Sequence, residues 1–288
     1  MSELWARFAI ESQRLVGVIE EPQMMSLLNE DGEMTDRQAG RLVDALTLPI
    51  RRAWDSDLPP RCSKQDVFPW RFRRNLSILM RPLVLVKTNP RGWLISAPFF
   101  EKSAKYMTAN IHEGRLPDRF FISSQLRAYI GGIVDQHGHA FAEQVAAVFR
   151  KSGYKAETEI RLTELGAPRN PDLGDVDVLA WKESGTGVFI VECKRLTPAL
   201  TVREVIQRLE DFKGDEHRKD SLGKHLARAR WLDKNRAGVQ KITGIPAAAI
   251  SFRPLVVTSE LMPMQFFEEM NFPTNQVVSV DELPTYLE

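Results

Sequence analysis

The chain has 288 residues, of which 43% are hydrophobic and 27% charged, a composition that is typical of a globular protein and unlike that of a disordered chain. No apolar run is as long as the roughly 18 residues that a membrane-spanning helix needs. The first residues are acidic, unlike those of a signal peptide, so we expect a cytoplasmic protein. The formal net charge of +1 argues against polyanion binding by the whole molecule. The two widely spaced cysteines argue against a disulfide framework and a zinc site.

The first 50 residues carry more acidic than basic side chains. Residues 3–21 and 34–48 have apolar side chains at helical spacing, which predicts two helical segments that form a cap. No internal repeat and no low-complexity tract interrupts this region.

Residues 61–91 reverse the sign of the charge and are strongly basic. Within them, residues 77–86 read as a strand that ends at the turn signal Asn-Pro-Arg-Gly. A helix is expected to follow to about Asn110, and Pro117 marks a break. We therefore divide the chain into an N-terminal α+β region of unknown role, residues 1–128, and a C-terminal α/β domain, residues 129–288.

The C-terminal domain has a clearer order of elements. A helix is predicted over residues 138–153, with apolar side chains on one face and Gly153 at its end. Three strands should follow, then helices, and then further strands. The expected strands cover residues 154–162, 175–181, 187–194, 250–259 and 275–280, and the expected helices cover residues 201–212, 217–235 and a short stretch near Phe266. The predicted order is α-β-β-β-α-β with additional pieces after it.

Charged residues interrupt two of these strands, in the stretch 174–196, GDVDVLAWKESGTGVFIVECKRL. If the central Ser-Gly dipeptide forms a hairpin turn, Asp177 faces Glu192 and Asp175 faces Lys194 across the hairpin. Because strand side chains alternate between the two faces of a sheet, all four should lie on the same side.

Two carboxylates that face each other at about 4.5–5.5 Å between Cβ atoms should repel. A hard divalent cation such as Mg²⁺, which prefers oxygen ligands, would compensate this repulsion. Lys194 beside the cation could stabilise the charge that develops on a phosphorane or orient a water molecule. The pattern therefore favours metal-assisted hydrolysis of phosphodiesters, with Mg²⁺ as the cofactor and Mn²⁺ expected to substitute for it.

At these residues the sequence resembles the PD-(D/E)XK nuclease superfamily, and within it the Mrr-like restriction endonucleases. The resemblance covers residues of about 135–288 and rests on Asp177, on Glu192-Cys193-Lys194 and on a preceding helix that carries Glu143. It implies an αβββαβ core with a mixed central sheet, and a metal held by Asp177, Glu192 and Glu143. The proline of the motif is absent, and Asp175 is an auxiliary ligand or a turn residue.

Weaker site candidates have competing interpretations. Glu143 lies opposite the apolar stripe of its helix, which is equally typical of a solvated helix residue. Gln207 lies on the helix after the Glu-x-Lys motif, where some members of the superfamily carry a glutamine near the site, and it also suits the helix surface. The stretch from Asp135 through His137 to His139 suggests a metal site, but no third partner has suitable spacing, so a loop or helix cap is the favoured interpretation.

Two basic stretches predict contact with nucleic acid. Residues 217–241 are rich in Lys and Arg, and residues 69–75, PWRFRRN, mix aromatic with basic side chains, a combination that stacks on bases and holds phosphates. The expected contacts are Lys224, Arg228, Arg230, Arg71, Arg73 and Arg74. A solvated basic helix and an aromatic core are the competing interpretations.

The sequence thus predicts a Mg²⁺-dependent nuclease, a DNA endonuclease of restriction or anti-phage defence, although repair nucleases share this fold. Expected partners are double-stranded DNA, a larger defence or repair complex, and a second copy in a homodimer. The alternatives are a nuclease fold without catalysis that binds nucleic acid or assembles a complex, a structural salt-bridge cluster, and a terminal piece of a larger nucleotide-driven machine.

Overall fold

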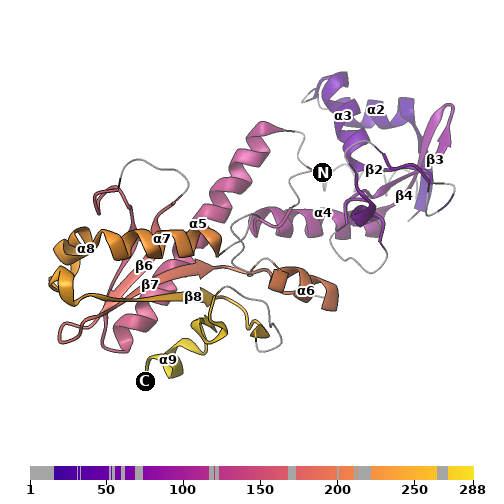
Figure 1. Ribbon diagram of the computed structural model, residues 1–288. Helices are drawn as coiled ribbons and strands as arrows, with labels where there is room; N and C mark the ends of the chain where they lie inside the picture. The colour runs from indigo at the N-terminus through magenta and orange to yellow at the C-terminus, as the bar shows by residue number, and fades with distance from the viewer. Residues whose placement is uncertain are drawn as a thin grey trace. The chain divides into compact units, whose positions relative to one another are not determined.

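The computed structural model divides into two compact units, Met1–Val134 and Asp135–Glu288. It describes residues 16–288 except 31, 33, 52, 54–55, 60–61, 69–73, 117–119, 121–122, 168–172, 200, 211, 213–221 and 265–271. Both units combine helices with a mixed sheet (Figure 1). The domain boundary that we predicted after residue 128 lies inside helix α5 (Ser124–Lys151). No described helix combines the length and apolarity that crossing a lipid bilayer requires.

Unit 1 is built on a four-stranded sheet in the order β1-β4-β3-β2. Its strands are β1 (Val16–Glu20), β2 (Thr47–Leu48), β3 (Leu83–Thr88) and β4 (Arg91–Ser96), and its helices are α2 (Glu21–Asn29), α3 (Asp36–Leu46), the 3-10 helix η1 (Lys64–Asp66) and α4 (Ala97–His112). Strands β1 and β3 pair with β4 antiparallel, and β2 pairs with β3 parallel. The core of the unit gathers around the buried Trp93.

Two predictions for unit 1 were wrong in part. Residues 16–20 continue the helical spacing of residues 3–21, yet they form β1, because they pair with residues 92–96 of β4. Residues 1–15 lie outside the described part of the chain. Residues 77–80 form a turn rather than the start of a strand, and β3 begins only after Pro82, which has no N–H to donate to a sheet.

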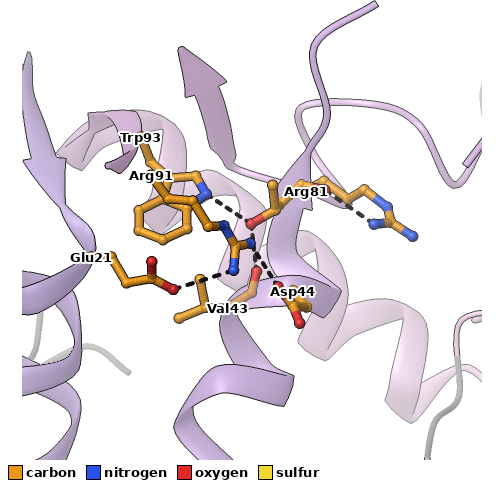
Figure 2. Close-up of polar contacts among 7 residues, drawn as sticks. Glu21, Val43, Asp44, Arg81, Arg91 and Trp93 are labelled. Atoms are coloured by element: carbon orange, nitrogen blue, oxygen red, sulfur yellow. Dashed lines mark hydrogen bonds and ion pairs between the residues drawn. The ribbon is translucent and has the colours of Figure 1, made fainter. Parts of the chain in front are cut away.

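Arg91 ties helices α2 and α3 to strand β4 (Figure 2). Its guanidinium lies 3.3 Å from the Glu21 carboxylate and 2.7 Å from that of Asp44, and it covers the ring of Trp93 at 5.0 Å. The indole Nε1 of Trp93 donates to Oγ1 of Thr47 at 3.0 Å. The largest core side chain therefore has its one polar atom satisfied, as a buried indole requires.

Unit 2 is built on a five-stranded sheet in the order β5-β6-β7-β8-β9. Its strands are β5 (Lys155–Ile160), β6 (Val176–Trp181), β7 (Gly187–Lys194), β8 (Ser251–Thr258) and β9 (Val277–Ser279), and its helices after α5 are α6 (Val202–Glu210), α7 (Gly223–Lys234), α8 (Arg236–Thr243), η3 (Ala247–Ala249), η5 (Thr274–Gln276) and α9 (Leu283–Leu287). Strands β5, β6 and β7 are antiparallel, and β8 and β9 add parallel. The short helix that we expected near Phe266 falls outside the described residues.

Helices cover both faces of this sheet (Figure 1). Helix α5 packs Phe141, Val145 and Phe149 on one face, which confirms the apolar stripe that the sequence predicted. Helices α7 and α8 pack Leu232 and Val239 on the other face. Strands buried on both faces need continuous apolar side chains, and β6 and β7 have them up to the point where their charged residues begin.

The close packing of helix α8 gives a stability prediction. A Cβ atom at Gly238 would lie 2.3 Å from the carbonyl oxygen of Leu165, so Gly238→Ala should destabilise the protein by about 1–3 kcal/mol, as overpacking does. At Gly138 in α5 no atom lies within 4 Å of such a Cβ, and Gly138→Ala should be neutral or stabilising by up to about 1 kcal/mol. Urea unfolding of the two variants tests this, and equal effects would contradict the packing at Gly238.

Candidate functional site

The hairpin of β6 and β7 has the register that the sequence predicted. Val178 pairs with Val191 and Trp181 pairs with Val188. One step beyond the Val178–Val191 pair stand Asp177 and Glu192, so the carboxylates come at the end of the β6–β7 pairing. Because β7 continues beside β8 as far as Lys194, this end of the sheet holds Glu192 and Lys194 on an ordered strand.

Glu192 is held by two cations. Its Oε1 atom lies 2.6 Å from Nζ of Lys194, and its Oε2 atom lies 2.7 Å from a guanidinium nitrogen of Arg228 in helix α7. Nε of Arg228 also donates to the carbonyl oxygen of Leu173 at 3.0 Å. Glu192 is 7% exposed and Arg228 is 4% exposed. Burial opposes ionisation of Glu192, but Lys194 and Arg228 outweigh it and hold the pKa of Glu192 below its ordinary value.

Asp177 has the opposite electrostatic balance. Burial, and then the negative charge of Glu192, raise the pKa of Asp177 to about 7. The N–H of Cys193 donates to its Oδ2 atom at 2.7 Å, and this bond, Arg228 and Lys194 oppose the increase without cancelling it. Asp177 therefore exchanges its proton near neutral pH. A carboxyl group with such a pKa suits acid–base chemistry, and it can release its proton when a cation binds.

His225 of helix α7 is a second unusual group in this site. Its ring is fully buried, its Nδ1 atom lies 3.9 Å from Oε2 of Glu192, and neither ring nitrogen has a hydrogen-bond partner among the described residues. Burial lowers the pKa of His225 to about 4, and Arg228 and Lys194 act in the same direction. His225 is therefore neutral at pH 7, and a neutral imidazole can accept a hydrogen bond or bind a metal.

Cations of the protein itself compensate part of the charge of the carboxylates. Lys194 and Arg228, together with partial protonation of Asp177, relieve the repulsion between the carboxylates, for which the sequence had suggested a metal ion. In the described part of the chain, no group of three His, Cys, Asp or Glu side chains is spaced to hold a metal. Asp177 and Glu192 still offer hard oxygen donors that suit Mg²⁺, and Glu192 would have to release one of its two cations to use them.

The structure places Glu143 of α5 against strand β5. Its carboxylate accepts hydrogen bonds from the Thr158 hydroxyl of β5 and, at 3.2 Å, from Arg150. The bond from Thr158 lowers the pKa of Glu143. No hydrogen bond or ion pair among the described residues joins Glu143 to Asp177 or Glu192. Asp175 is exposed directly before β6.

The expected nucleic-acid contacts fall into three groups. Lys224 and Arg230 lie exposed on α7, as a surface contact requires. Arg228 needs correction: its side chain is buried against Glu192 and Leu173, so it positions the site rather than touching phosphates on the surface. The others lie at the edge of the described residues or outside them. Arg71 and Arg73 are outside, and Arg74 donates to the carbonyl oxygen of Phe68 at 3.3 Å. The side chain of Gln207, which was a catalytic candidate, also lies outside the described residues.

One signal in the sequence could have placed Arg228 correctly. Leu222, His225, Ala229 and Leu232 are buried at helical spacing, and Arg228 falls on this stripe. A cation on the apolar face of a helix needs a buried anion as its partner. The number of Lys and Arg residues in the segment does not show this, whereas their position relative to the apolar face does.

The structure also supplies a partner for the histidine-containing stretch of α5. Nδ1 of His139 lies 2.8 Å from Oε1 of Glu159 in β5. Glu159 was not a candidate, because no local spacing connects it to His139. The contact arises because α5 runs along β5, and this packing is invisible in either segment alone.

Comparison with known proteins places the chain in a family. Neither the curated proteins nor the solved structures include a match to it. The model of one protein family, described as anti-phage protein Upx-like, matches residues 8–284. Since this match covers both units and most of the chain, the protein belongs to the Upx-like family of anti-phage proteins.

Proposed function

We propose that this anti-phage protein is a metal-dependent nuclease that hydrolyses phosphodiester bonds of DNA, with its active site at the end of the β6–β7 hairpin. The observation that carries the proposal is the convergence of Asp177, Glu192 and Lys194 at the position where the two strands stop pairing. Two carboxylates and one ammonium on neighbouring strands suit the charge changes of phosphodiester hydrolysis.

The architecture of unit 2 supports the proposal. One helix is followed by three antiparallel strands, then by helices that return to a fourth strand, which is parallel to the third. This is the order that the resemblance to PD-(D/E)XK nucleases implies, and the Asp and Glu-x-Lys residues lie on its second and third strands. Since fold alone does not establish function, the charges and distances at the site are the stronger support.

The residues of the chain have separable roles in this reaction. Asp177 and Glu192 would hold Mg²⁺, which when bound would polarise the phosphate and acidify a water molecule. Arg228 fixes the carboxylate of Glu192 from the buried side. Lys194 is 30% exposed, so its ammonium can turn from Glu192 toward a phosphate whose negative charge increases in the transition state.

One observation favours the second candidate, a nuclease fold without catalysis. Both oxygens of Glu192 are occupied by cations, as they would be in a purely structural salt-bridge cluster. Under this alternative, unit 2 would bind nucleic acid or a protein partner through the exposed face of α7, which carries Lys224 and Arg230.

Cleavage of DNA separates the two functions. We expect the purified protein to cut plasmid or linear DNA with Mg²⁺ or Mn²⁺, and EDTA or Asp177→Ala to abolish cutting. Glu183→Ala is the matched control, because Glu183 is an exposed carboxylate at the tip of the same hairpin, paired with Lys155. If DNA and RNA in single- and double-stranded form all remain intact, or if Asp177→Ala cuts like the wild type, the nuclease proposal fails.

The role of Lys194 gives a second prediction. Lys194→Ala should lower the single-turnover rate by about 10²–10³-fold, the effect of removing one group that stabilises transition-state charge. The affinity for Mg²⁺ should stay equal or rise, because a competing positive charge is removed. Lys182→Ala is the control, since this exposed lysine of the same hairpin lies over the ring of Tyr154. A normal rate for Lys194→Ala at saturating Mg²⁺ would assign the lysine to structure alone.

A further inference from the structure

Glu159 has an unusual backbone conformation. Its φ angle is 55°, and it is the one non-glycine residue with positive φ among those that the structure describes. An L side chain rarely adopts this conformation because Cβ meets the backbone. It also interrupts the sheet: Thr158 pairs with Val178 and Ile160 pairs with Val176, while Glu159 and Asp177 between them do not pair. Strain of this kind in an ordered strand suggests a functional constraint.

The carboxylate of this strained residue binds His139. Oε1 of Glu159 lies 2.8 Å from Nδ1 of His139, and the side chains are 39% and 62% exposed. With Nδ1 engaged, Nε2 is the ring atom left to act, and no described residue bonds it. A carboxylate that orients an imidazole through Nδ1 and leaves Nε2 accessible is a recurrent arrangement for proton transfer.

The pair lies beside the candidate active site. The hydrogen bond to Glu159 raises the pKa of His139, and the charges of Glu159, Asp135 and Asp177 add to it while burial opposes it. These three carboxylates come from β5, α5 and β6. The charge of Glu159 also acts on the thiol of Cys193, next to Glu192. The sheet pairing gives the same placement: Glu159, which binds His139, stands opposite Asp177 between the two flanking pairs of β5 and β6.

We propose that His139 is a catalytic residue that donates a proton from Nε2 to the leaving oxygen of the cleaved phosphodiester, and that Glu159 positions it. This inference rests on the proposed nuclease function and adds a residue that the resemblance to PD-(D/E)XK nucleases does not include. In this view His139, rather than Glu143 one turn later on α5, is the side chain of that helix that serves the site.

The proposed step is a hydrolysis in which His139 supplies one proton. An oxygen–phosphorus bond forms between water and the phosphate, and the proton that water loses passes to solvent. The bond from phosphorus to the leaving oxygen breaks, and that oxygen takes the proton of His139 Nε2. Neutral His139 then regains a proton from solvent, which its three surrounding carboxylates favour. No oxidant, reductant or further reactant is needed.

The leaving group provides the test. His139→Ala should lower the single-turnover rate on ordinary DNA by about 10²-fold or more, the usual contribution of a general acid. On DNA in which a sulfur atom replaces the leaving oxygen at one defined linkage, the same variant should cut that linkage nearly as fast as the wild type, because a thiolate leaves without protonation. Equal losses on both substrates would overturn the proposal and assign His139 to phosphate binding.

Matched variants and a measurement without catalysis complete the test. His137→Ala, two residues earlier on α5, should cut both substrates like the wild type, and Glu159→Gln should behave as a milder His139→Ala. In the metal-free protein, NMR titration should show a His139 pKa above 6.5 that falls in Glu159→Gln, and an unchanged value would overturn the positioning role.

The outcomes also separate this inference from the proposed function. A wild-type protein that cuts with Mg²⁺ while His139→Ala cuts ordinary DNA at the same rate would overturn only the role of His139. A wild-type protein that cuts no nucleic acid would overturn both proposals.

Discussion

Arg228→Ala is expected to destabilise the metal-free protein by about 3–5 kcal/mol, the usual cost of removing one partner of a buried ion pair. The reason is the environment of Glu192. With Arg228 absent, its carboxylate stays buried, keeps only Lys194 as a countercharge, and loses the guanidinium that also caps the carbonyl oxygen of Leu173. Urea unfolding at pH 8 in EDTA measures this effect.

Three further variants establish the cause. Arg230→Ala removes an exposed arginine two residues later on α7 and should change stability by less than about 0.5 kcal/mol. Arg228→Lys should recover part of the loss, because it keeps the charge without the planar fork. Adding Glu192→Gln to Arg228→Ala should also recover stability, since the buried carboxylate that lost its guanidinium would be replaced by a neutral amide. If Arg228→Ala unfolds at the same urea concentration as Arg230→Ala, the buried pair does not stabilise the fold.

Asp177→Asn is expected to stabilise the metal-free protein strongly at pH 8 and by about a third as much at pH 5. Burial raises the pKa of Asp177 from 3.8 to about 7 in the folded protein. The stability that this carboxyl contributes is complete below pH 3.8 and is lost progressively as the pH rises from 3.8 through about 7. At about 1.4 kcal/mol per pKa unit, the difference sets an upper bound of about 4 kcal/mol. Asparagine keeps an oxygen that can accept the hydrogen bond from Cys193.

The comparison of variants isolates this effect from that of His225. The pKa of His225 is lowered to about 4, so its stability contribution is present above pH 6.5 and is lost as the pH falls toward 4. In the wild type, the pH dependence of stability that comes from Asp177 opposes the one that comes from His225. The difference in stability between wild type and Asp177→Asn contains mainly the contribution of Asp177. Asp175→Asn, at an exposed position directly before the same strand, is the control variant.

A metal adds a second arm to the same experiment. If Asp177 binds Mg²⁺, adding Mg²⁺ at pH 8 should stabilise the wild type by mass action and leave Asp177→Asn unchanged. A wild type and a variant that respond equally to Mg²⁺ would remove Asp177 from the metal site. A stability difference that is the same at pH 5 and pH 8 would show that Asp177 does not titrate in this range.

The predictions that held depend on local patterns. The register of the β6–β7 hairpin follows from a short turn and from the alternation of side chains, so the sequence alone placed Asp177 beside Glu192 and Glu192 beside Lys194. The apolar stripe of α5 and the order of strands in unit 2 follow from spacing over a few residues. Residues 16–20 show the limit of such patterns, because β4, far along the chain, makes them a strand.

The partners of the charged side chains at the site depend on tertiary packing. Arg228 meets Glu192 across 36 residues, and His139 of α5 meets Glu159 of β5. Helices α5 and α7 pack on opposite faces of the sheet, and both bring basic side chains to the end where β6 and β7 stop pairing. Periodicity says which face of a helix is buried, but not against which strand or at what height. The partner strand and the position along it follow only from how the apolar faces pack together. They determine which charged side chains are buried and which pKa values are shifted.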